Sequence, residues 1–269
     1  MELTVPDNRG EIEIAIINDI LGFAEYNSQD KELQEAVKVY FGDNYNYAKS
    51  IYDEFKRHGH VEIERHFIDE YTFAKMKSIS TEIVEAYNKY KEKIEDEVNK
   101  LFGIDLPKRL DLVTILIPKP EPPSGARYLS GGGYLEDMKV IALRIYNDID
   151  LEKEMSKIID VLIHEILHAA FDNSEIKNKP SHDQEEALLR YFTPRGIISL
   201  LTGLIKTFDL DELYKNELKS IHNPDYLSEF KNLFPYIKDY YAQLSYGKQN
   251  ILNYLADKIK FNNKHKIHQ

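Results

Sequence analysis

Residues 161–171 read Val-Leu-Ile-His-Glu-Ile-Leu-His-Ala-Ala-Phe. Within this apolar run, His164, Glu165 and His168 form the pattern H-E-x-x-H. On a helix, residues four apart lie on one face, one turn from each other, so both imidazoles can bind the same metal ion. The glutamate beside the first histidine can then reach a water on the open side of that ion.

The alternative to a metal site is a core helix with two hydrogen-bonded histidines and an exposed glutamate. A five-residue pattern also arises by chance. The apolar residues around the motif favour the metal site, because polar side chains in such surroundings are costly unless a partner satisfies them.

Composition and charge limit the other classes of function. The chain has 269 residues, of which 42% are hydrophobic and 30% charged, as is typical of a soluble globular protein. The net charge of −11 argues against nucleic-acid and anionic-membrane partners. The absence of cysteine excludes disulfides and cysteine zinc sites. The N-terminus does not resemble a signal peptide and no apolar run is long enough to cross a bilayer, so a cytoplasmic location is expected.

The apolar pattern divides the chain into three regions. Residues 1–108 are expected to form helices, including one long helix from about 80 to 102. Residues 109–195 are expected to hold a small α+β region with the motif helix at about 151–171. Residues 196–269 are expected to be helical again. The predicted fold class is α+β and mostly helical.

Two short strands are expected before the motif helix. Leu112–Ile117 is rich in β-branched residues, and Lys139–Tyr146 is a second apolar run. The segment from Pro118 to Gly133 is predicted to be a loop. Its Gly131-Gly132-Gly133 run does not fit a phosphate-binding loop, since no helix follows it directly and no lysine is placed as in a P-loop.

The helix after the motif helix has a well-marked start. Ser181, followed three residues later by Gln184, forms a capping box. Pro194 and Gly196 are expected to end this helix. Its acidic first turn offers a third ligand, which a catalytic zinc site needs in addition to two histidines and a water.

Glu185 is the preferred third ligand. It follows His168 by 17 residues and shares a helical face with apolar residues that should point inward: Leu188, Leu189 and Phe192. Glu186 points about a third of a turn away and is the alternative, and His182 is a weaker one. Acidic residues also favour the first turn of any helix, so neither glutamate requires a metal.

The spacing of these residues resembles the gluzincins, the thermolysin-like division of the zincin metallopeptidases. The resemblance covers about residues 111–193 and is closest to minimal gluzincins. It implies a zincin-like core, with a short sheet, an active-site helix and a glutamate helix, flanked by helical N- and C-terminal regions. In the zincin core an edge strand pairs with extended peptide substrate, and Lys139–Tyr146 is expected to be that strand.

The chain departs from the thermolysin pattern around the third ligand. Thermolysin has an aspartate four residues after its glutamate, where this chain has Leu189 or Arg190. Partners that orient the histidines are therefore expected elsewhere, from Asp160 or a backbone carbonyl.

The resemblance implies a zinc metallopeptidase with one Zn²⁺ ion, an endopeptidase rather than an exopeptidase, that cleaves a peptide or protein substrate. The ion would lower the pKa of its water, and Glu165 would act as the general base. The donor to the oxyanion is left open among five candidates: Tyr128, Tyr134, Arg190, Tyr191 and His182. The alternative function is a latent or non-hydrolytic zinc-binding regulatory protein with the same fold.

Overall fold

The computed structural model describes residues 1–26, 31–117, 129–175, 180–221, 223–243 and 249–259. The chain forms two compact units that interleave along the sequence. The first consists of Met1–Lys89 and Lys108–Glu165, and the second of Tyr90–Pro107 and Ile166–Gln269. The α+β class expected from the sequence is confirmed.

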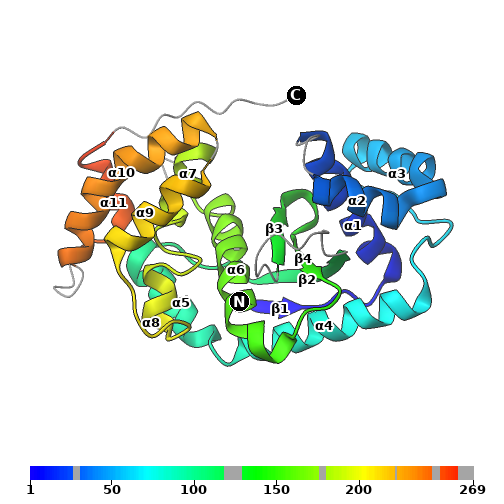
Figure 1. The fold of residues 1–269 in the computed structure, drawn as a ribbon, viewed down its shortest axis with the longest axis horizontal. Helices are drawn as coiled ribbons and strands as arrows, with labels where there is room; N and C mark the ends of the chain where they lie inside the picture. The colour runs from blue at the N-terminus through cyan, green and yellow to red at the C-terminus, as the bar shows by residue number, and fades with distance from the viewer. Residues whose placement is uncertain (27–30, 118–128, 176–179, 222, 244–248, 260–269) are drawn as a thin grey trace. The chain divides into compact units, whose positions relative to one another are not determined.

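The first unit contains a four-stranded mixed sheet in the order β1-β2-β4-β3 (Figure 1). Its strands are β1 (Glu2–Thr4), β2 (Arg109–Ile117), β3 (Leu129–Leu135) and β4 (Val140–Tyr146). Strands β1, β2 and β4 are parallel, and β3 is antiparallel to β4. A 3₁₀ turn, Glu136–Met138, joins β3 to β4, and Lys139 follows it in the left-handed conformation.

The position of β4 corrects the expectation that Lys139–Tyr146 is the edge strand. β4 lies between β2 and β3, and all seven of its residues are buried. Strand β3 occupies the edge instead, and it includes Gly131-Gly132-Gly133, which the sequence assigned to a loop. Because glycine has low β propensity, the local sequence does not predict this strand. Its pairing with β4 stabilises it.

Helices α1 (Arg9–Tyr26) and α4 (Glu70–Asn88) cover opposite faces of the sheet. The hydroxyl of Ser80 on α4 donates to that of Thr114 on β2 at 2.9 Å, so Thr114 points towards α4. Side chains alternate along a strand, so Ile115 and its register partner Arg144 point to the other face. There Arg144 meets α1.

The remaining helices of the first unit pack around α1. They are α2 (Lys31–Phe41), the 3₁₀ turn Gly42–Asn44 and α3 (Tyr45–His58), and α3 ends at Gly59 in the left-handed conformation. The prediction of a single helix from about 80 to 102 is wrong. Helix α4 ends at Asn88, and α5 (Lys91–Phe102) begins after a two-residue break. The apolar period continues across the break, so periodicity alone does not reveal it.

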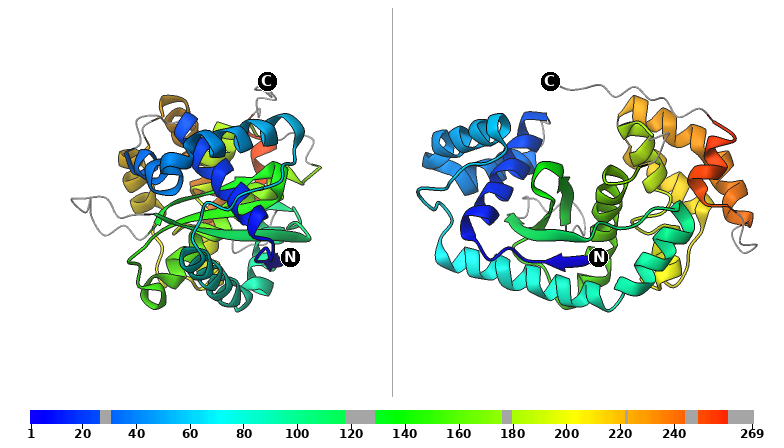
Figure 2. Two further views of the ribbon diagram at one scale, coloured as in Figure 1. Left: turned by 90° about the vertical axis from the view of Figure 1, so that its right-hand side faces the viewer. Right: turned by 180° about the vertical axis from the view of Figure 1, so that it is seen from behind.

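The motif helix α6 (Leu151–Asp172) confirms the prediction of a helix at about 151–171. Its first turn carries Glu152 and Glu154, which interact favourably with the helix dipole. The boundary between the two units passes through α6, between Glu165 and Ile166. Figure 2 gives two further views of this continuous helix and of the sheet.

The second unit is helical. It contains α5 and the helices α7 (His182–Leu189), α8 (Ile197–Thr202), α9 (Leu210–Ser220), α10 (Pro224–Gln243) and α11 (Ile251–Ala256). Helix α7 ends at Leu189, before the Pro194 and Gly196 expected to end it. Aromatic rings form its core, with Phe102 on α5 against Phe192 at 4.7 Å between centroids, and Tyr191 stacked on Phe230 at 4.4 Å. In the part of the chain that the structure describes, no helix combines the length and apolarity that crossing a membrane requires.

Candidate metal centre

Helix α6 brings His164 and His168 to one side of the helix. The apolar side chains around them are fully buried, which fixes the rotation of α6 about its axis: Leu162, Ile163, Ile166, Leu167, Ala169, Ala170 and Phe171. His164 is itself buried, with 6% of its surface exposed. The four-residue spacing therefore places both imidazoles on one side of α6, as the sequence predicts.

Helix α7 carries the two candidate glutamates. The capping box at its start is present, with the Ser181 hydroxyl accepting from the Gln184 amide and the Gln184 side chain accepting from the Ser181 amide. This cap fixes where the helix begins, and therefore where its first two turns point. Ala187, Leu188 and Leu189 are buried, while Glu185 and Glu186 remain partly exposed.

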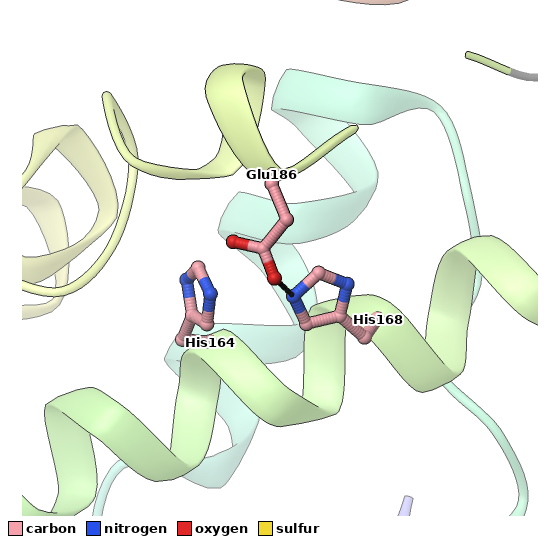
Figure 3. Close-up of side chains that lie close together, drawn as sticks. All are labelled: His164, His168 and Glu186. Carbon is pink, nitrogen blue, oxygen red and sulfur yellow. Dashed lines mark ion pairs between the residues drawn. The ribbon is translucent and has the colours of Figure 1, made fainter. Parts of the chain in front are cut away.

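The two glutamates approach different nitrogens of His168. The Glu185 Oε1 atom lies 2.7 Å from Nδ1, and the Glu186 Oε1 atom lies 3.1 Å from Nε2. Among the described residues, His164, His168 and Glu186 form a group that could hold a metal ion, since their ligand atoms all lie within 4.8 Å of one another. Figure 3 shows Glu186 reaching from α7 towards both imidazoles.

This donor set fits a zinc ion. Two imidazole nitrogens and one carboxylate oxygen are ligands that zinc commonly takes. Bonds of about 2.1 Å in a tetrahedral arrangement separate ligand atoms by about 3.4 Å, within the span of this group. The Glu185 carboxylate can only accept a hydrogen bond from a neutral imidazole, so its contact favours the proton on Nδ1 and leaves the Nε2 lone pair for the metal.

The Glu165 side chain interacts electrostatically with a buried carboxyl group. It is buried, with 7% of its surface exposed, and its charge acts on Asp19 of α1. Asp19 is fully buried, and its Oδ2 atom lies 3.7 Å from Nε of Arg144. Burial, opposed by Arg144 and reinforced by Glu165, raises the pKa of Asp19 to about 6. Asp19, Arg144 and Glu165 are therefore coupled electrostatically within the first unit.

The candidate donors for an oxyanion are dispersed. Tyr191 is fully buried and donates to the Phe230 carbonyl at 2.6 Å, so its hydroxyl is used in packing. The His182 ring centroid lies 6.4 Å from that of His168, and Nη1 of Arg190 lies 3.7 Å from Glu217. Tyr134 pairs with Ile141 in the sheet. Tyr128 lies outside the described residues.

Three residues near the motif were missed by sequence reasoning. Asp19 sits in the apolar stretch Ala15–Leu21 of α1, and a lone carboxylate in such a stretch is a signal that could have found it. Arg144 is likewise a lone charge in the apolar run of β4. Tyr226, on which the charge of Glu186 acts, carries no comparable signal, because nothing in its spacing sets it apart from the other 18 tyrosines.

Comparison with protein-family models, with curated proteins and with solved structures gives no match to this chain.

Proposed function

We propose that this protein is a zinc-dependent metallopeptidase of the gluzincin type. In this proposal His164, His168 and Glu186 hold one zinc ion, and Glu165 is the general base. The observation that carries the proposal is that the ligand atoms of His164 and His168 on α6 and of Glu186 on α7 all lie within 4.8 Å of one another, and that α6 also bears Glu165.

The assignment of Glu186 rather than Glu185 as the third ligand follows from the two contacts of His168. The Nδ1 contact with Glu185 is the kind of hydrogen bond that orients a metal-binding histidine. With the proton on Nδ1, the Nε2 lone pair faces Glu186 Oε1 at 3.1 Å. The imidazole lone pair and the carboxylate oxygen are both acceptors, so at this distance they need a cation between them. That cation is either a second proton on the imidazole or a metal ion.

The strand arrangement supports the same class of function. Strand β3 is an antiparallel edge strand, and β4 leads directly into α6 through Asn147–Asp150. An edge strand has unpaired backbone donors and acceptors, which an extended peptide can pair with. We propose that β3, in place of Lys139–Tyr146, is the strand along which the substrate binds.

A zinc ion bound here would lower the pKa of a coordinated water and polarise the peptide carbonyl. Glu165 follows His164 directly and would accept a proton from the attacking water, then deliver it to the leaving nitrogen. Glu185 would hold the His168 ring in one orientation throughout.

The decisive experiment measures metal content and hydrolysis in the same samples. Purified protein is expected to contain about one equivalent of zinc and to hydrolyse unfolded casein, with activity lost on chelation and restored by zinc. Glu165→Gln is expected to keep the zinc and lose the hydrolysis. A metal-free protein that takes up no zinc would overturn the proposal. Zinc binding without hydrolysis in the wild-type chain would favour the latent or non-hydrolytic alternative.

A further inference from the structure

A cluster of polar side chains lies in the helical unit, near the end of α7. It consists of Arg190 at the end of α7, Tyr226 in the first turn of α10 and Glu217 on α9. Arg190 follows Glu186 by four residues, so the two side chains project from the same side of α7. Nη1 of Arg190 lies 3.7 Å from Oε2 of Glu217, which balances its charge.

Tyr226 is held against α7 by the packing of α10. One turn further along α10, Phe230 stacks on Tyr191 at 4.4 Å, and the Phe230 carbonyl accepts from the Tyr191 hydroxyl. Gln184 near the start of α7 also lies 3.5 Å from Glu229. Because Tyr226 and Phe230 are four residues apart, they share the face of α10 that packs on α7.

The Tyr226 hydroxyl is buried beside charged groups. The oxygen atom is shielded from solvent, and the charges that act on it are those of Arg190, Glu186 and Glu217. A phenol hydroxyl can donate a hydrogen bond. When a carboxylate binds a metal through one oxygen, its other oxygen needs a hydrogen-bond donor, and a buried hydroxyl can be that donor.

Resting on the proposed metal site, we infer that Tyr226 and Arg190 are positioning residues for the third ligand, Glu186. They supply a hydroxyl and a guanidinium to the carboxylate, and so hold it in the orientation that meets His164 and His168. Glu217 holds Arg190 in turn. The C-terminal helices α9 and α10 therefore contribute directly to metal affinity.

Zinc affinity tests this inference without any need to know the substrate. Tyr226→Phe removes only the hydroxyl, and competition with a chromophoric chelator at fixed pH is expected to give affinity about tenfold weaker or more. Tyr240→Phe is the matched control, because Tyr240 is on the same helix and is buried, and burial alone raises its pKa to about 12. Its zinc affinity is expected to equal that of the wild type.

Arg190 gives an independent second variant. Arg190→Gln is expected to weaken zinc binding as Tyr226→Phe does, and Arg190→Lys, which keeps the charge, to restore part of the affinity. Unchanged affinity in both Tyr226→Phe and Arg190→Gln, with metal-free melting temperatures equal to that of the wild type, would overturn the inference and leave the metallopeptidase proposal standing. A wild-type protein that binds no zinc would overturn both.

Discussion

Asp19 of α1 and Arg144 of β4 form an ion pair with almost no access to solvent, in which Oδ2 of Asp19 lies 3.7 Å from Nε of Arg144. Among the described residues, neither Asp19 oxygen has a hydrogen-bond partner. Removing both charges from water costs several kcal/mol per ion. The pair therefore makes this part of the first unit sensitive to pH.

Stability is expected to fall as the pH rises through the range in which Asp19 loses its proton. Burial raises the pKa of Asp19 from 3.8 to about 6, so the folded state binds this proton more tightly than the unfolded state. The contribution is fully present below about pH 4 and is lost as the pH rises through 6, with a size on the order of 3 kcal/mol. Urea unfolding at pH 3.5 and 7 measures it.

The control for this prediction is Asp19→Leu combined with Arg144→Met. The double variant has neither charge, so the fall attributed to Asp19 is expected to disappear from its pH profile. Asp19→Leu alone leaves Arg144 buried without this partner and is expected to be less stable than the double variant at pH 7. Identical pH profiles for wild type and double variant would contradict the assignment of the shift to Asp19.

Glutamine substitutions distinguish the two glutamates of α7. Glu186→Gln is expected to weaken zinc binding much more than Glu185→Gln, because Glu186 lies on the Nε2 side of His168 with His164. Glu185→Gln removes a partner of Nδ1 and is expected to cost about 10-fold to 100-fold in affinity. The reverse order, measured with the same chelator competition, would restore Glu185 as the third ligand.

The helix cap of α7 is expected to affect both stability and metal affinity. Ser181→Ala removes the oxygen that accepts from the Gln184 amide and is expected to cost about 1 kcal/mol in urea unfolding. Zinc affinity is expected to fall as well, since both glutamates lie in the first turns of this helix. Asn250→Ala removes the corresponding cap of α11 and should lower stability by a similar amount while leaving zinc affinity unchanged. Equal zinc affinity in the two variants would contradict the role given to the α7 cap.

Gly196, seven residues after the end of α7, is expected to tolerate no side chain. A Cβ atom there would lie 2.4 Å from the Tyr191 carbonyl oxygen and 2.5 Å from the Phe192 carbonyl carbon. These are backbone atoms, so Gly196→Ala is expected to cost about 2–3 kcal/mol in urea unfolding. Gly59→Ala is the comparison, because φ is +70° but nothing lies within 4 Å, and its cost should be about 1 kcal/mol. Equal losses would show that the Gly196 contact relaxes.

The part of the site that depends on local sequence was predictable. The predicted helix at about 151–171 matches α6 to within one residue at its C-terminal end, and the position of His164 and His168 on one side of it follows from the helical repeat alone. The capping box at Ser181 was equally local and is present. Each of these features involves residues no more than four positions apart.

The parts that depend on pairing between distant segments were not predictable. Strand β3 contains three glycines and was assigned to a loop, because its strand character comes from hydrogen bonding to β4. Strand β1 has only three residues, Glu2–Thr4, which is too short for an alternation to be visible. The same limit applies to Tyr226, which lies on α10 and is brought to α7 only by the packing of the two helices.

The choice between Glu185, which the sequence favours, and Glu186 is limited for a different reason. Residues 185 and 186 both reach one imidazole, from opposite ring nitrogens, so each lies near the motif. Apolar neighbours on a helix show which side chains point inward. They do not show which nitrogen of the His168 ring a glutamate approaches.

The origin of two ligands in a single helix has a consequence for how α6 unwinds. A metal ion bound to His164 and His168 would cross-link consecutive turns, so opening that turn would require breaking a coordination bond as well as backbone hydrogen bonds. Amide hydrogen exchange near the C-terminal end of α6 should then slow when zinc is added, even in a Glu165→Gln protein that performs no chemistry.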